Sequence, residues 1–131
     1  MEDYFKTVKN FLLELNLDIV FENRKEGILM IRDHRSGIKN LIIGVSYPIL
    51  VMEHFLIEIS DGDFQAHKAL LQKNREIVHG AFALDDSGSK LIFRDTLQID
   101  HLDRNELQGS INSLALLMTE FLEQLLKLKK I

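Results

Sequence analysis

Between residues 19 and 59 the chain alternates apolar segments with very short polar connections. The apolar segments are residues 19–21, 28–31, 41–47 and 49–59, and the first connections read NRKEG and DHRSG. Two parallel strands need a crossover of about a dozen residues or more, whereas antiparallel strands can be joined by a tight turn. Gly27 and Gly37 stand where such turns favour a positive φ. The sequence therefore predicts an antiparallel meander.

A further antiparallel pair is predicted for residues 78–100, which read VHGAFALDDSGSKLIFRDTLQID. A turn within DDSGSK lets Phe82 face Phe93, and Asp95 then falls on the same side as these residues, opposite Gly80. The apolar face consists of Val78, Phe82, Leu84, Leu91, Phe93 and Leu97. The other face consists of His79, Ala81, Ala83, Ile92, Arg94 and Thr96, with His79 opposite Thr96. A register shift of one residue would exchange the two faces.

Apolar residues also recur at helical spacing at both ends of the chain. The first stripe is Phe5, Val8, Leu12 and Leu15, and the second is Leu107, Ile111, Leu114, Met118, Phe121, Leu125 and Leu128. Asp103, with Glu106 three residues later, is predicted to cap the second helix. A single stripe favours a long helix laid across the sheet. The alternative is a coiled-coil seam between two chains.

A shorter helix is predicted over residues 64–75. Ser60 and Asp63 resemble a capping box with an acid in the glutamate position. The apolar residues of this helix, Phe64, Leu70 and Leu71, form only a thin stripe. We therefore expect this helix at the edge of the sheet or at an interface.

The predicted order of elements is α-β-β-β-β-α-β-β-α, which indicates an α+β fold, a two-layer sandwich of an antiparallel sheet and helices. A length of 131 residues fits a single domain spanning residues 1–131. The strand over residues 49–59 carries Leu50, Met52 and Phe55, so that both of its faces are apolar. Two apolar faces require more helix than this chain offers, which favours a second copy or a client protein as additional cover.

Composition excludes several classes of function. The net charge of -4 and the pI near 5.7 disfavour nucleic-acid binding, which needs clustered Lys and Arg. The absence of cysteine excludes disulfides and thiolate metal sites, and it fits a cytoplasmic location. The longest apolar tract, residues 41–59, is interrupted by Glu53, His54 and Glu58, so we expect no membrane span. The N-terminal MEDYFKTVKN carries charges where a signal peptide requires an apolar stretch.

No pattern of reactive residues predicts chemistry. The histidines are His34, His54, His67, His79 and His101, and no two of them have the spacing of metal ligands. Glu53 and Glu58 point to opposite faces of their strand, and Ser87 lacks the surroundings of a nucleophile elbow. The glycines form no nucleotide-binding loop. We therefore expect no catalytic residues, no metal and no cofactor, and a function in binding.

The segment LLQKNREIVHGAFALDDSGSKLIFRDTLQIDHLDRNELQGSINSLALL resembles the YbjN family, bacterial proteins related to the class I type III secretion chaperones and often described as Tir-chaperone-like. The residues that carry the resemblance are Leu71, Asn74, His79, Gly80, Ala81, Phe82, Phe93, Arg94, Asp95, Thr96, Leu97, Leu102, Asp103, Leu107 and Ile111. The segments GIKNLII and PILVMEHFL are similar to the central strands of the family. The resemblance implies a type III secretion chaperone-like fold and a cytoplasmic homodimer that binds an extended segment of another protein.

The expected protein-binding or dimer surface combines the short helix with one face of the hairpin. It consists of Phe64, His67, Leu71, His79, Ala81, Ile92, Arg94 and Thr96. The client that this surface would bind is not identified by the sequence. The alternative function is that of a regulatory domain that binds a small ligand or a folded protein.

Overall fold

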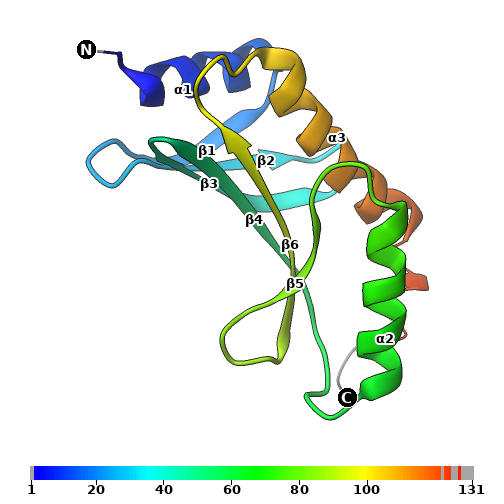
Figure 1. Ribbon diagram of the computed structural model, residues 1–131. Coiled ribbons are helices and arrows are strands. Elements are labelled where there is room, and N and C mark those ends of the chain that lie inside the picture. Colours follow the sequence, from blue (N-terminus) through cyan, green and yellow to red (C-terminus); the bar gives the residue numbers. More distant parts are fainter. Residues whose placement is uncertain (1, 122, 125–126, 128–131) are drawn as a thin grey trace.

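The computed structural model describes residues 2–121, 123–124 and 127 (Figure 1). The elements are α1 (Tyr4–Glu14), β1 (Asp18–Asn23), β2 (Ile28–Asp33), β3 (Ile38–Ser46), β4 (Ile49–Glu58), α2 (Phe64–Lys73), the short 3-10 helix η1 (Asn74–Glu76), β5 (Ala81–Leu84), β6 (Lys90–Gln98) and α3 (Arg104–Glu120). The predicted order of helices and strands is confirmed, with η1 as the only addition among the described residues.

The strands form one six-stranded antiparallel sheet in the order β1-β2-β3-β4-β6-β5. Gly27 and Gly37 adopt φ angles of 71° and 78° in the turns after β1 and β2, as tight turns require. In the β5–β6 hairpin Phe82 pairs with Phe93, which is the predicted register. Because β6 pairs with both β4 and β5, the hairpin extends the meander at its β4 side.

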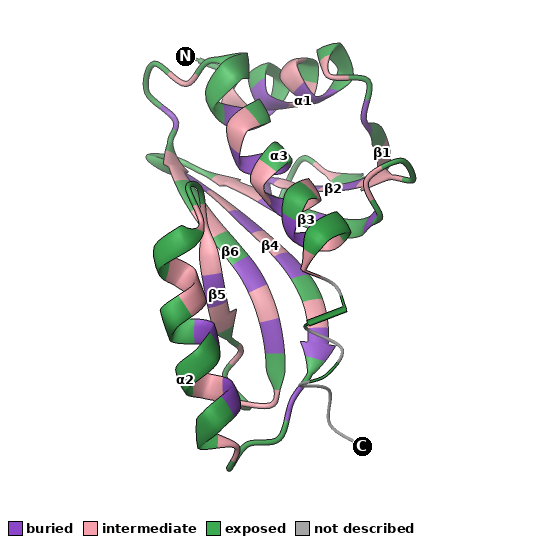
Figure 2. Cartoon of the chain, turned by 90° about the vertical axis from the view of Figure 1, so that its right-hand side faces the viewer, coloured by how far each residue is buried: buried purple, intermediate pink, exposed green. Residues whose placement is uncertain are grey.

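The helices and the sheet make two layers. Helices α1 and α3 lie over one face of the sheet, and α2 runs alongside the edge strand β5 (Figures 1 and 2). Figure 2 shows buried residues alternating with more exposed ones along β4 and β6, as expected for strands with one covered face. The core between the layers includes Val8, Leu12, Leu29, Ile31, Leu41, Ile43, Leu50, Met52, Leu91, Phe93, Leu107, Ile111 and Leu114. The apolar stripe of α3 therefore packs on the sheet, as predicted, while Leu125 and Leu128 lie outside the described residues.

The first strand of the hairpin is shorter than predicted. Strand pairing begins at Ala81, and the preceding Gly80 has a φ of 78°. A Cβ at Gly80 would lie 2.4 Å from the Phe93 ring, so only glycine fits here. The predicted pairing of His79 with Thr96 is wrong, and Val78 is 84% exposed instead of lying on the apolar face.

Helix α2 begins at Phe64, as predicted, but its cap differs. The side chain of Asp63 accepts a hydrogen bond from the backbone N–H of Ala66, whereas Ser60 accepts only through its backbone carbonyl. Asp63 is therefore the N-cap residue, and the predicted capping by Ser60 is wrong. Ala66 and Leu70 are the buried residues of this helix. None of the helices in the described part of the chain is long and apolar enough to cross a membrane.

Candidate protein-binding site

The sheet face opposite α1 and α3, called the open face below, carries a row of paired residues across all of its strands. The row runs Phe21, Met30, Ile42, Glu53, Arg94 and Ala81. Large apolar side chains remain accessible on this face: Phe21 and Phe55 are each 49% exposed, and Ile42 is 43% exposed. Apolar surface of this kind, repeated over neighbouring strands, is typical of a surface that binds another protein.

A single ion pair interrupts the apolar row. Arg94 Nη1 donates a hydrogen bond to Glu53 Oε1, and the two residues face each other on β4 and β6. Both side chains stay accessible, with 43% of Arg94 and 40% of Glu53 exposed. The pair therefore presents two opposite charges to solvent at the centre of an apolar surface.

The polar residue next to Arg94 points to the other face of β6. Asp95 accepts hydrogen bonds from the hydroxyl of Ser110 on α3 and from the backbone N–H of Thr96. Ser110 is fully buried, and this partly buried contact joins α3 to the covered face of β6. Arg94 and Asp95 thus serve different purposes: Asp95 is bonded within the fold, and Arg94 faces outward.

A second apolar surface lies where α2 meets β5. Phe64 is 82% exposed and Leu71 is 70% exposed on α2, and Leu84 is 42% exposed on β5. Between them lies a groove of about 330 Å³, lined by His67, Leu70, Leu71, Asn74, Phe82, Ala83, Leu84 and Leu91. The Nε2 atom of His67 is buried and has no hydrogen-bond partner within the described part of the chain.

Asn74 closes part of the free edge of β5. The side-chain carbonyl of Asn74 accepts from the backbone N–H of Phe82 at 2.7 Å, and the Asn74 amide donates to the Phe82 carbonyl at 3.3 Å. These two bonds imitate the pairing of a neighbouring strand. An edge strand satisfied in this way is less available for open-ended pairing with other chains.

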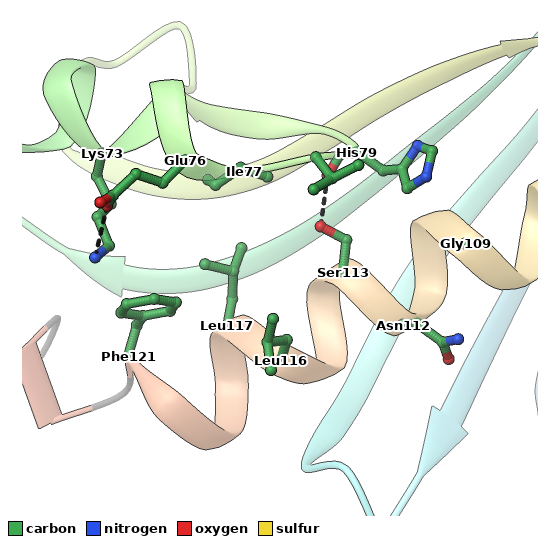
Figure 3. A pocket seen from close by; sticks show the side chains of 11 residues that line it. Lys73, Glu76, Ile77, His79, Gly109, Asn112, Ser113, Leu116, Leu117 and Phe121 are labelled. Atoms are coloured by element: carbon green, nitrogen blue, oxygen red, sulfur yellow. Dashed lines mark hydrogen bonds and ion pairs between the residues drawn. The ribbon is translucent and has the colours of Figure 1, made fainter.

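His79 lies apart from both surfaces. Its backbone carbonyl accepts a hydrogen bond from Ser113 Oγ at 2.7 Å, and its ring packs against Gly109 of α3 (Figure 3). It lines a pocket of about 220 Å³ together with Lys73, Glu76, Ile77, Val78, Gly109, Asn112, Ser113, Leu116, Leu117 and Phe121. The prediction that His79 shares the outer face of the hairpin is wrong, because the chain turns at Gly80 before β5 begins.

The remaining predicted site residues form two groups. Phe64, His67 and Leu71 lie on α2, whereas Ala81, Ile92, Arg94 and Thr96 lie on the open face. The two groups meet only at the edge strand β5. The sequence did not reveal Glu53 as the partner of Arg94, since the two residues are far apart in the chain. Asn74 was among the residues that carry the resemblance to the YbjN family, but no pattern in the neighbouring sequence predicted its hydrogen bonds to β5.

Ionisable groups in the described structure are mostly solvated, and His54 is the clearest exception. His54 is buried on the covered face of β4, where its Nδ1 donates to the Phe55 carbonyl and its Nε2 accepts from the Lys39 backbone N–H. Burial lowers the pKa of His54 below its usual value. Both ring nitrogens are satisfied in the neutral form, so His54 joins β3 to β4 as a structural residue. Among the described residues, no three His, Cys, Asp or Glu side chains are grouped as metal ligands.

The chain is an α+β sandwich whose open antiparallel sheet and α2 leave two apolar surfaces accessible. The chain matches the family model CesT_Tir_1 over residues 1–131. It therefore belongs to this family of type III secretion chaperones, in agreement with the resemblance seen in the sequence. No curated protein is similar enough in sequence to count as a match.

Solved structures share the fold at low sequence identity. A chain of the heterodimeric ExoU–SpcU complex from the type III secretion system of Pseudomonas aeruginosa is similar with a TM-score of 0.68 and 17% identity, covering 94% of this chain and 98% of that one. A chain of the HopA1–SchA chaperone–effector complex gives 0.67 and 17%, covering 92% and 94%. YbjN from E. coli, described as a proposed transcription regulator, gives 0.61 and 15%, covering 90% and 88%. These similarities show a type III secretion chaperone-like fold.

Proposed function

We propose that this protein is a non-enzymatic, chaperone-like module that binds an extended segment of a partner protein and acts as a homodimer. The observation that carries the proposal is the open face, where Phe21, Ile42 and Phe55 expose apolar side chains that no helix of the described chain covers. Membership of the CesT_Tir_1 family supports this function, as do similar folds described in chaperone–effector complexes. In this proposal residues 1–131 are one domain, and the lack of cysteine suits a cytoplasmic protein.

The homodimer is assigned to the surface formed by α2 and β5. Phe64 and Leu71 project from α2 into solvent beside the groove along β5. A two-fold dimer places the same patch on both partners, so exposed apolar side chains on α2 pack against their own copies. Because Asn74 already occupies the edge of β5 at Phe82, the contact relies on side-chain packing more than on added strand pairing. The dimer leaves the open face free for the partner segment.

Light scattering tests the dimer. The wild-type chain is expected to show a mass near twice 15.2 kDa. The double variant Phe64→Glu with Leu71→Glu should show the mass of one chain, since charges in an apolar interface are unpaired and desolvated. Leu13→Glu, at a 51% exposed position on α1, is the matched control and should remain dimeric. A wild-type monomer, or a double variant that stays dimeric, contradicts this assignment.

Affinity capture from cytoplasmic extract tests the binding face. Phe55→Asp places a charge on the open face, whereas Leu13→Asp places the same charge on exposed α1. A genuine partner of the open face is retained by the wild type and by Leu13→Asp and is lost by Phe55→Asp. If Phe55→Asp, shown to be folded by its denaturation curve, captures the same proteins as the wild type, the open face is not the binding surface.

A further inference from the structure

The Glu53–Arg94 pair lies at the centre of the open face, where Thr96 is a polar neighbour and most other neighbours are apolar. On β4 its neighbours along the strand are Val51 and Phe55, and across the sheet Ile42 of β3 pairs with Glu53. A segment that covers Phe55 and Ile42 therefore also covers the ion pair. The pair must then exchange its contacts with water for contacts with that segment.

Much of the hydrogen-bonding capacity of this pair is unused. A guanidinium carries five N–H donors, and a carboxylate can accept several hydrogen bonds. In the described part of the chain, the side chains of Arg94 and Glu53 have only the one hydrogen bond that joins them. Their remaining donors and acceptors face solvent, in accordance with exposed fractions of 43% and 40%.

The chemistry of a segment that covers the pair decides how tightly it binds. A purely apolar segment leaves the remaining donors and acceptors unpaired, which lowers affinity by about tenfold or more for a buried polar group. A carboxylate in the segment bonds Arg94 but is repelled by Glu53, and an ammonium group has the opposite problem. A side-chain carboxamide donates to Glu53, accepts from Arg94 and adds no charge.

We propose that the Glu53–Arg94 pair is a specificity element, by which the open face selects segments that carry Asn or Gln among apolar side chains. This inference rests on the proposed function, because it assumes that the open face binds an extended segment. The pair acts by weakening the binding of other segments. A fully apolar segment leaves donors of Arg94 and acceptors of Glu53 unpaired, and a segment with a single charge is repelled by one member of the pair. It thus restricts binding on a surface that would otherwise hold apolar segments without distinction.

Fluorescence anisotropy with short labelled peptides tests the inference. In these peptides Leu and Ser alternate, so that in the extended form the Leu side chains share one face, and the central Leu is kept or replaced by Gln, Glu or Lys. The wild type should bind the Gln peptide about tenfold more tightly than the Leu peptide. The Glu and Lys peptides should bind more weakly than the Gln peptide.

Two double variants separate recognition from a structural role. Glu53→Leu with Arg94→Leu makes the centre apolar, so it should bind the Leu peptide more tightly than the wild type does and lose the preference for Gln. Glu53→Arg with Arg94→Glu exchanges the charges, and since a carboxamide can turn around, the preference for Gln should survive. Denaturation curves establish that both variants are folded.

The outcomes distinguish this inference from the function on which it rests. If the wild type binds all peptides equally, or if the apolar double variant keeps the ranking, the selection by the ion pair is wrong while segment binding stands. If neither the wild type nor the folded apolar variant binds any peptide, segment binding by the open face is wrong, and the inference falls with it.

Discussion

The two faces of β4 and β6 are built from the same strands but have opposite surroundings. On the covered face Met52 and Phe93 are fully buried under the helices, whereas on the open face Phe55 is 49% exposed. Polar groups differ in the same way: Asp95 is bonded to buried Ser110, and Arg94 is bonded to accessible Glu53. The comparison teaches that apolar side chains alone do not identify the core of this protein. The covered face packs into the core, whereas the open face keeps its apolar surface accessible to solvent.

The largest change in stability is expected when a phenylalanine of the covered face is replaced, and a phenylalanine of the open face serves as its comparison. Phe93→Ala should lower the free energy of unfolding by about 3–5 kcal/mol, because it leaves a cavity in a packed core. Phe55→Ala, on the open face of the neighbouring strand, should change it by less than about 1 kcal/mol. Urea denaturation of both variants measures the difference. Equal losses would mean that the open face is also packed, by a second copy or another cover.

The next largest change in stability is expected from the loss of the hydrogen bond between Ser110 and Asp95. Ser110→Ala removes the hydroxyl that donates to Asp95, and the free energy of unfolding should fall by about 1–3 kcal/mol because a partly buried carboxylate loses a partner. Ser113→Ala, on the same helix but at an exposed hydrogen bond, is the control and should have a smaller effect. Denaturation curves measure both variants. A larger loss for Ser113→Ala than for Ser110→Ala would show that the hydrogen bond between Ser110 and Asp95 contributes little to stability.

The sequence was sufficient to predict the strands, the antiparallel pairing and the hairpin register, since alternation of side chains reports which face a residue occupies. Phe82 facing Phe93 is an example. Alternation does not report which distant segment lies alongside, so the contact of Arg94 with Glu53 was not predicted. The predicted position of His79 was wrong for a local reason: Gly80 adopts a positive φ, so the strand begins at Ala81, later than the apolar pattern indicates.

Acidification should destabilise the covered face through His54. In the folded chain burial lowers the pKa of His54, while in the unfolded chain the imidazole titrates near its ordinary value of about 6.5. At pH values between the pKa of His54 in the folded chain and its pKa in the unfolded chain, the unfolded chain binds more protons than the folded one. The free energy of unfolding therefore falls as the pH drops below about 6.5, and His54 does not affect it at higher pH. Denaturation curves measured from neutral to mildly acidic pH check the direction. The free energy of unfolding of His54→Gln should depend less steeply on pH than that of the wild type. The same slope in both proteins would contradict the assignment.

The smallest effect on folding is expected for Arg94→Ala, on the open face. Its ion pair with Glu53 is 43% and 40% exposed, and accessible ion pairs contribute between 0 and about 1 kcal/mol. The free energy of unfolding should therefore change by less than about 1 kcal/mol, far less than for Phe93→Ala. Binding should change in a characteristic way, because Glu53 then stands alone on the apolar surface and favours a peptide with a central Lys. A denaturation curve and the peptide series measure both effects. If Arg94→Ala destabilises the fold as strongly as Ser110→Ala, the ion pair belongs to the architecture of the sheet, and the contrast between the two faces is weaker than their exposure indicates.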